Sequence, residues 1–142
     1  MDNGRRKFLN IIIAGGIAGW VASVIYPVIS YLKPPKIPEA QVNSVKGGTV
    51  SDFPPNSGQI IQFGRIPVIL IRTVDGKFKA FEATCTHLDC IVQYRTDTHR
   101  IWCACHNGVY DLNGRNISGP PPKPLTQYNV NISDDEIFIT KA

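Results

Sequence analysis

Residues 85–108 read CTHLDCIVQYRTDTHRIWCACHNG and contain all four cysteines of the 142-residue chain. Each end of this stretch carries a short cluster, C-T-H-L-D-C over residues 85–90 and C-A-C-H-N-G over residues 103–108. Each cluster offers a thiolate and an imidazole at short spacing, with 15 residues between His87 and Cys103. The chemistry of the chain is therefore expected on these two loops.

The residue types alone leave two interpretations open. A Cys₂His₂ zinc site would place four of these side chains around one tetrahedral ion. Two disulfides would instead use all four cysteines and leave the histidines without a role. Neither interpretation explains why each loop carries a second cysteine beside its Cys–His pair.

The spacing C-x-H…C-x-x-H resembles that of the Rieske iron–sulfur proteins. More narrowly, C-T-H-L-x-C followed by C-x-C-H resembles the Rieske subunit of the quinol-oxidising cytochrome bc and bf complexes. The resemblance implies one [2Fe–2S] cluster per chain. Its metal ligands would be Cys85 and Cys103 on one iron, and His87 and His106 on the other.

The same resemblance gives roles to residues outside the ligand set. It implies a disulfide between Cys90 and Cys105 that pins the two loops together, worth about 3 kcal/mol for a loop of this length in the chain-entropy model. Residues 119–125, GPPPKPL, resemble the proline loop that covers the cluster from a third side. That loop would comprise Gly119, Pro120, Pro121 and Pro122. Leu88 is expected to shield the cluster or to dock against a partner, since the family has leucine there.

Histidine ligation has a physical logic of its own. Two thiolates and two neutral imidazoles leave an oxidised [2Fe–2S] core without net charge, so it accepts an electron more easily than a four-thiolate cluster. The potential rises to roughly −150 to +300 mV, against about −400 mV for plant-type clusters. An exposed second nitrogen of His87 or His106 would couple electron uptake to proton uptake. These two residues are therefore the expected catalytic groups towards a quinol.

Two hydrogen-bond donors tune the cluster in the family, and this chain is expected to keep one of them. Tyr110 matches the tyrosine whose hydroxyl bonds a ligand cysteine sulfur, but Gly108 stands where high-potential members carry a serine. Losing a donor to sulfur is expected to lower the potential and to favour a low-potential quinol such as menaquinol. Alternatively, glycine suits the turn and a water supplies the hydrogen bond. Asp89, Ala104 and Asn107 also depart from the family, which usually has glycine, proline and glycine there.

Towards the C-terminus the chain predicts short strands separated by turns, among them Asp75-Gly76 and Asn113-Gly114. With the resemblance, this pattern predicts an all-β Rieske domain over residues 49–142, an antiparallel β-sandwich with cluster-binding loops. The expected strands are Ile60–Phe63, Pro67–Thr73, Lys77–Phe81, Ile101–Cys103, Val109–Leu112, Tyr128–Ile132 and Glu136–Thr140.

Towards the N-terminus, residues 11–32 form an uncharged stretch of 22 residues, IIIAGGIAGWVASVIYPVISYL. As a helix it would cover roughly 33 Å, enough for one membrane crossing. No A-x-A cleavage site follows, so a retained anchor is favoured over a signal peptide. Residues 1–10 contain GRRKFLN, which resembles a twin-arginine export signal. Residues 33–48 are expected to be a Pro/Gly tether that begins as extended polyproline.

Composition excludes other classes of protein. With 43% apolar and 18% charged residues, the chain is not expected to be disordered. Its net charge is +4, of which residues 1–10 contribute +2 through three basic residues against one acidic residue. The other +2 is interspersed with acidic residues, so no basic stripe for nucleic acid is expected.

Together these features predict a membrane-anchored Rieske subunit of a bacterial cytochrome bc-type complex. It would be single-pass in the cell membrane, with a cytoplasmic N-terminus and a periplasmic head. It would take one electron from a quinol bound in a cytochrome b subunit and pass it to a c-type cytochrome. It would act within a dimeric multi-subunit complex, as a redox subunit without a complete active site of its own.

Three alternatives stay open. The Rieske small subunit of an exported molybdenum oxidase of the arsenite oxidase type shares the export signal and the second cysteine pair. Soluble Rieske ferredoxins of aromatic-ring oxygenases lack that cysteine pair and the anchor. A non-redox zinc-binding scaffold module is the alternative from another class.

Overall fold

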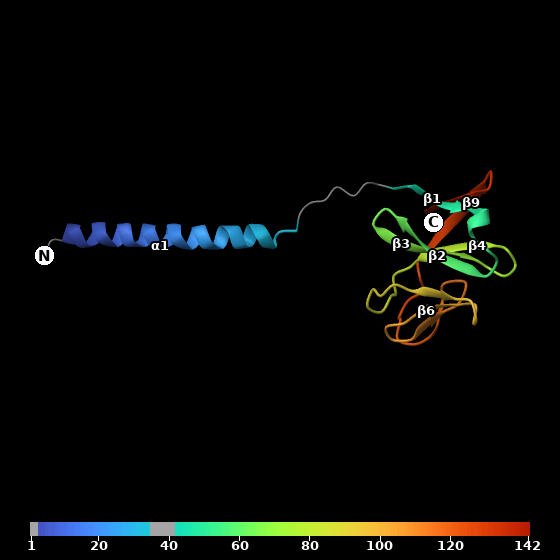
Figure 1. The fold of residues 1–142 in the computed structure, drawn as a ribbon. Coiled ribbons are helices and arrows are strands. Elements are labelled where there is room, and N and C mark those ends of the chain that lie inside the picture. The colour runs from blue at the N-terminus through green and yellow to red at the C-terminus, as the bar shows by residue number, and fades with distance from the viewer. Residues whose placement is uncertain (1–2, 35–41) are drawn as a thin grey trace. The chain divides into compact units, whose positions relative to one another are not determined.

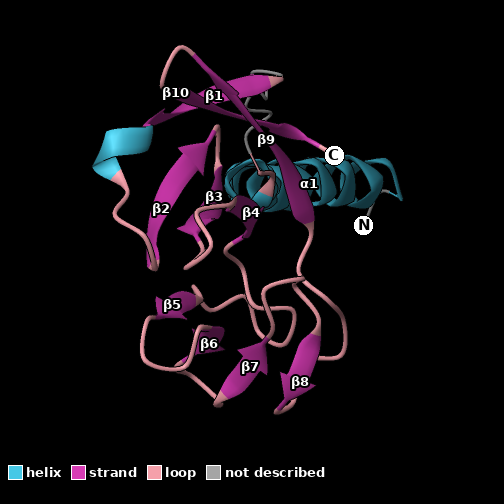
Figure 2. Cartoon of the chain, turned by 90° about the vertical axis from the view of Figure 1, so that its right-hand side faces the viewer, coloured by secondary structure: helices cyan, strands magenta, loops and turns pink. Residues whose placement is uncertain are grey.

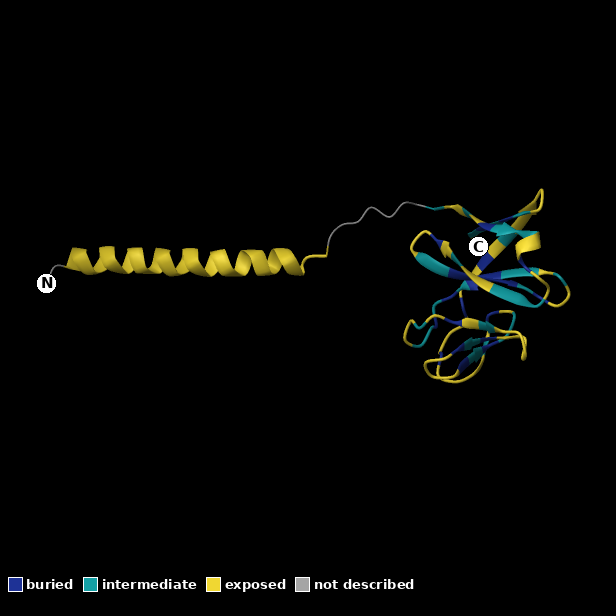
Figure 3. Cartoon of the chain, viewed as in Figure 1, coloured by how far each residue is buried: buried dark blue, intermediate teal, exposed yellow. Residues whose placement is uncertain are grey.

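The computed structural model describes residues 3–34 and 42–142, which belong to two compact units divided after residue 39 (Figure 1). The first unit contains helix α1 (Asn3–Leu32), 30 residues long and exposed along its whole length (Figure 3). The helix is long and apolar enough to cross a membrane. It begins earlier than the predicted anchor, so most of residues 1–10 are helical as well.

Over its described residues, 42–142, the second unit is a head built from ten antiparallel strands in two sheets. Figure 2 shows the smaller sheet, β5 to β8, set apart from the larger one. The six-stranded sheet has the order β1-β10-β9-β4-β3-β2, and the four-stranded sheet has the order β5-β6-β7-β8. The strand bounds are β1 Ser44–Thr49, β2 Ser57–Phe63, β3 Ile66–Arg72, β4 Phe78–Glu82, β5 Gln93–Arg95, β6 Arg100–Cys103, β7 Gly108–Tyr110, β8 Asn116–Ser118, β9 Gln127–Ser133 and β10 Glu136–Lys141.

Strand β3 divides the head into two hydrophobic cores. Its apolar run is buried on both faces, with Val68 and Leu70 on one side and Ile69 and Ile71 on the other. This follows from the period of two along a strand, which sends successive side chains to opposite faces. The first side packs against β9 and β10, and the second packs towards the small sheet and its loops. A strand buried on both faces explains why the sequence here is continuously apolar.

The large sheet also folds over on itself. Strands β4 and β9 pair at only two positions, Ala80 with Tyr128 and Phe81 with Gln127. Beyond this corner, β9, β10 and β1 lie over β3, so that a Cβ added at Gly47 in β1 would lie 3.2 Å from Leu70 Cδ2. The region between β4 and β9, residues 83–126, forms the small sheet and all the candidate loops. We call this region the insert and the large sheet the base.

The structure corrects the predicted boundaries of the head. Residues 44–48 were assigned to the tether, but they belong to strand β1, which pairs with β10. The head therefore begins before residue 49. Strands β5 and β8 were also missed, and the remaining predicted strands shift by one to three residues at their ends. The predicted polyproline stretch lies largely outside the described residues.

Candidate metal centre

The first candidate loop, residues 85–90, follows strand β4 and is closed by backbone hydrogen bonds. The Cys85 N–H donates to the Cys90 carbonyl oxygen (2.8 Å), and the Asp89 N–H donates to the Cys85 carbonyl oxygen (3.0 Å). Asp89 has a φ of +55°, a left-handed conformation that aspartate adopts more readily than most residues. Aspartate therefore supports the turn at a position where glycine was the expected residue.

The second candidate loop, residues 103–108, is the turn between β6 and β7, where Cys103 pairs with Gly108. Asn107 also has a φ of +55°. Its side-chain oxygen accepts a hydrogen bond from the Trp102 indole N–H (2.7 Å). Asparagine thus keeps the left-handed backbone and ties the turn to β6. Sequence reasoning missed this contact, because the spacing of these two residues carries no signal of it.

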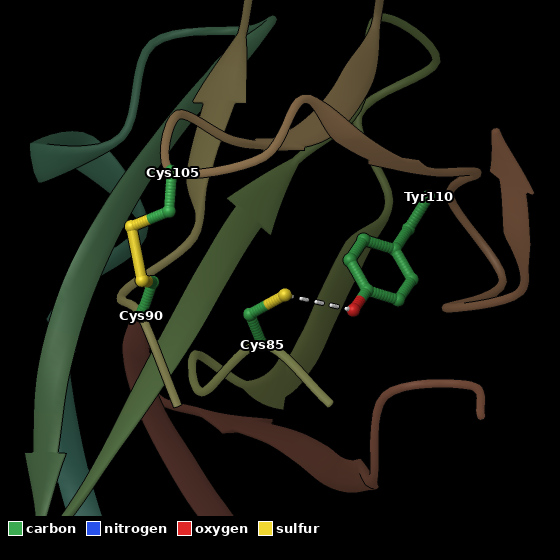
Figure 4. The surroundings of a disulfide bond; sticks show 4 residues. All are labelled: Cys85, Cys90, Cys105 and Tyr110. Atoms are coloured by element: carbon green, nitrogen blue, oxygen red, sulfur yellow. Dashed lines mark hydrogen bonds between the residues drawn. A yellow bond between two sulfur atoms is a disulfide. The ribbon is translucent and has the colours of Figure 1, made fainter. Parts of the chain in front are cut away.

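A disulfide between Cys90 and Cys105 joins the two loops, as predicted (Figure 4). The sulfur of Cys103 lies within 4.8 Å of both disulfide sulfurs. Because disulfide sulfurs are not thiolates, Cys90 and Cys105 are removed from the possible metal ligands. Cys85 and Cys103 are the free cysteines. The interpretation with two disulfides is therefore wrong.

The two free thiols are buried side by side. Cys85 and Cys103 are each 2% exposed and belong to the same core cluster. Burial raises the pKa of the Cys103 thiol. Burial acts on Cys85 in the same direction, but its hydrogen bonds, the largest contribution being that of the Tyr110 hydroxyl, together outweigh burial and lower the Cys85 pKa. The thiolate, which is the form that binds metal, is therefore easier to form at Cys85 than at an ordinary cysteine.

Tyr110 holds its hydroxyl against the first loop, 3.4 Å from the Cys85 sulfur (Figure 4). The ring is fully buried. The hydroxyl oxygen accepts a hydrogen bond from the Thr86 N–H (3.2 Å). Its own proton has two acceptors within reach, the Cys85 sulfur and the Thr86 hydroxyl oxygen at 3.2 Å. Tyr110 therefore lies within hydrogen-bonding distance of the Cys85 sulfur, and its tuning role stays a prediction.

The two candidate histidines come together from different loops. The ring centroids of His87 and His106 lie 4.7 Å apart, with an angle of 85° between the planes. The Nδ1 atom of His87 is buried and has no hydrogen-bond partner among the described residues. A buried polar atom without a partner is costly and calls for an explanation. A metal ion bound at this nitrogen would supply one.

The proline loop, residues 119–125, contacts both other loops. The Thr86 hydroxyl donates to the Lys123 carbonyl oxygen (2.8 Å), which attaches it to the first loop. Gly119, at a φ of +89°, lies so close to the second loop that an added Cβ would be 2.8 Å from Gly108 Cα. Pro121 is buried, whereas Pro120 and Pro122 are exposed.

Two further residues, Leu88 and His99, are exposed. Leu88, between the first-loop histidine and Asp89, is 63% exposed although it is a large apolar side chain. An exposed leucine beside a metal site fits contact with a partner better than packing in a core. His99 lies apart from the site, in the β5–β6 turn, where its Nδ1 is 2.8 Å from Asn56 Oδ1.

Comparison with known proteins identifies this arrangement. Residues 43–129 match the model of the Rieske [2Fe-2S] domain. The chain belongs to the Rieske family. A Rieske domain holds one [2Fe–2S] cluster, so the interpretation as a zinc site is wrong.

Individual relatives indicate which kind of Rieske protein the chain is. Over 142 residues the chain is 39% identical to the cytochrome b6-f complex iron-sulfur subunit of Chlorobaculum tepidum, covering 100% of this chain and 78% of the relative. Among solved structures, the cyanobacterial plasma membrane Rieske protein PetC3 from Synechocystis is 25% identical, with a TM-score of 0.62 over 68% of this chain and 98% of that one. A hyperthermophilic respiratory Complex III chain shares the fold, with a TM-score of 0.56 and 23% identity over 91% of this chain and 97% of that one. The chain is thus a Rieske protein of the cytochrome bc type.

Proposed function

We propose that Cys85 and Cys103 bind one iron of the Rieske cluster and that His87 and His106 bind the other. The observation that carries this assignment is the convergence of two buried free thiols and two adjacent imidazoles, one of which has a buried Nδ1 without a partner in the described part of the chain. These side chains fit the donor set of a Rieske cluster, two thiolates and two imidazoles. When bound, the cluster supplies one-electron transfer.

The residues of this chain have separate tasks around that site. The disulfide between Cys90 and Cys105 fixes the distance between the loops. The Tyr110 hydroxyl stabilises negative charge on the Cys85 sulfur by donating to it. If His87 binds iron through Nδ1, its Nε2 remains to hydrogen-bond a quinol oxygen. His106, which is exposed, offers the same group from the second loop.

The proposed electron donor is a quinol bound in a cytochrome b subunit, and the proposed acceptor is a c-type cytochrome. Quinol oxidation releases electrons and protons together, which suits a site whose outermost groups are imidazoles. The exposed Leu88 beside His87 offers an apolar contact for docking. The relatives are named as iron-sulfur subunits of the cytochrome b6-f complex. Their alignment with this chain covers all of it, including the apolar helix.

We propose menaquinol as the quinol, because Gly108 provides no side-chain donor to the cluster. One donor, Tyr110, is present, and fewer hydrogen bonds to sulfur mean a lower reduction potential. A midpoint potential near +300 mV, at the top of the Rieske range of roughly −150 to +300 mV, would contradict this assignment.

The orientation in the membrane follows from the N-terminal sequence. Arg5, Arg6 and Lys7 precede the uncharged part of α1, so the N-terminus is proposed to be cytoplasmic and the head periplasmic. If the paired arginines are an export signal, Arg5→Lys with Arg6→Lys should abolish export although the charge is unchanged. Protease added to spheroplasts would then no longer reach the head. Lys7→Arg is the control that should export normally.

The central experiment is purification of the tagged full-length chain from membranes in mild detergent. Co-purification of b-type and c-type haem, with haem c reduced on addition of a menaquinol analogue, would support the proposal. His106→Ala should abolish this reduction and His99→Ala should preserve it. Co-purification with a molybdenum-containing subunit and no haem b would overturn the proposal.

A further inference from the structure

Gly108 is surrounded so closely that the fold leaves no room for a side chain there. A Cβ built on Gly108 would lie 2.6 Å from Pro121 Cγ and 3.0 Å from Pro121 Cδ. These are ring atoms of a buried proline, so they cannot swing aside as the end of a flexible side chain would. Without them, the nearest remaining atom is Cys103 Cβ at 3.7 Å, an ordinary contact.

Pro121 is in turn held in place from both ends of its loop. On one side, Ser118 pairs with Val109 across β8 and β7, and Gly119 lies against the backbone of residues 107–108. On the other side, the Lys123 carbonyl oxygen accepts a hydrogen bond from the Thr86 hydroxyl. The Leu125 N–H donates a hydrogen bond to the Gly114 carbonyl oxygen. A shift of the Pro121 ring would therefore disturb contacts to both cluster loops.

We propose that Pro121 and Gly108 form a matched pair that keeps a hydroxyl donor away from the Cys103 side of the site. The Pro121 ring fills the space that a serine at position 108 would need. The low potential is then a property of two positions in two loops, and a change at position 108 alone cannot reverse it. Pro121 is a positioning residue in this account. The inference rests on the proposed ligand set and deepens the proposed preference for menaquinol.

The test is a double-mutant cycle on the full-length chain in detergent, using Gly108→Ser, Pro121→Ala and the two combined. Two quantities are measured at one fixed pH: the midpoint potential and the rate at which the visible absorbance of the cluster is lost on mild heating. Gly108→Ser alone should accelerate cluster loss several-fold, because the proline loop is displaced. The double variant should lose its cluster more slowly than Gly108→Ser. Its reduction equilibrium constant should exceed that of wild type at least tenfold, which is about 59 mV for one electron.

Two control variants distinguish the steric effect of a side chain at position 108 from the effect of its hydrogen bond. Gly108→Ala with Pro121→Ala has the Cβ without the hydroxyl, and its potential should stay below that of the serine double variant. Gly108→Ser with Pro122→Ala removes an exposed proline instead, and it should lose the cluster as fast as Gly108→Ser alone.

The pairing is overturned if Gly108→Ser alone raises the potential as much as the double variant does with no faster cluster loss. It is also overturned if the double variant shows no rise. A wild-type chain without cluster, or with a potential near the top of the Rieske range, would instead contradict the proposed function. The two failures are therefore distinguishable.

Discussion

The base and the insert of the head are stabilised by different physical means. The core of the base consists of aliphatic and aromatic side chains from five strands and the segment after β1, among them Leu70, Ile137 and Ile139. The core of the insert side includes Cys85, Cys103 and Tyr110, and its strands are only three or four residues long. Burial of apolar area accounts for the first region. The second also buries apolar side chains such as Val92 and Ile101, but it depends in addition on a disulfide, a buried tyrosine and a bound cofactor.

Because of this difference, the stability of the fold depends mainly on the base, whereas cluster binding depends on the insert. A region stabilised by packing tolerates changes at distant sites, but three short loops around a cluster depend on each cross-link between them. The comparison can be tested by substituting residues in one region and measuring whether the stability or the cluster properties of the other region change.

The largest effect is expected from the ligands. His87→Ala or His106→Ala should abolish cluster binding, because one iron would lose a protein ligand, while the far-ultraviolet circular dichroism of the base should remain. Iron analysis and the EPR signal of the reduced protein measure the loss. His99→Ala is the matched control, and a cluster lost in that variant would show that the ligand assignment is wrong.

A large loss of stability is expected from the base. Leu70→Ala should lower the free energy of unfolding by about 2–5 kcal/mol, as for other buried leucines. The midpoint potential and EPR line shape of the folded protein should stay unchanged, since Leu70 faces the core away from the insert. Ile101→Ala, in the insert core, is the comparison. If Leu70→Ala altered the potential as much as Ile101→Ala did, the two regions would not be separable.

Loss of the disulfide should destabilise the insert by an energy similar to that of Leu70→Ala in the base. Replacing Cys90 and Cys105 together by serine removes a cross-link worth about 3 kcal/mol in the chain-entropy model. Some cluster should still bind, since neither residue is a proposed ligand, but it should be lost faster and at a lower potential. Thermal bleaching and voltammetry measure both. Equal stability and potential in wild type and variant would show that the bridge has no role.

The smallest of these effects is expected from the tyrosine hydroxyl. Tyr110→Phe removes the donor to the Cys85 sulfur, and hydrogen bonds to charged groups contribute about 1.5–3 kcal/mol. With 59 mV equivalent to ~1.4 kcal/mol for one electron, the midpoint should fall by up to about 60–130 mV. Tyr128→Phe, a buried tyrosine in the base, should leave the midpoint unchanged. If the midpoint potential fell equally in both variants, the hydrogen bond from Tyr110 would not be the cause.

The sequence predicted the long strands of the base better than it predicted the limits of the head. Long β-branched runs such as Ile66–Arg72 predict strands whatever their surroundings. Strand β1 contains Gly47 and Gly48, which favour a turn in isolation. It forms a strand because β10 offers an edge. Glycine fits at position 47 because an added Cβ would be tightly packed, 3.2 Å from Leu70 Cδ2. Such tertiary causes leave no local pattern.

Within the site, the cysteine and histidine spacing carried the interpretation, and the resemblance supplied the disulfide and Tyr110. Three features depended on the folded chain alone. They are the unpartnered Nδ1 of His87, the hydrogen bond from Trp102 to Asn107, and the contact of Pro121 with Gly108. Each depends on where the folded chain places a side chain, which spacing in the sequence does not encode.

The most direct test of the account is metal and sulfide analysis of the purified full-length chain beside its His87→Ala and His99→Ala variants. Wild type and His99→Ala should each contain two iron atoms and two acid-labile sulfides per chain, as a Rieske [2Fe–2S] domain requires. His87→Ala should contain neither. One equivalent of zinc without sulfide in wild type, or a full cluster in His87→Ala, would contradict the proposed centre.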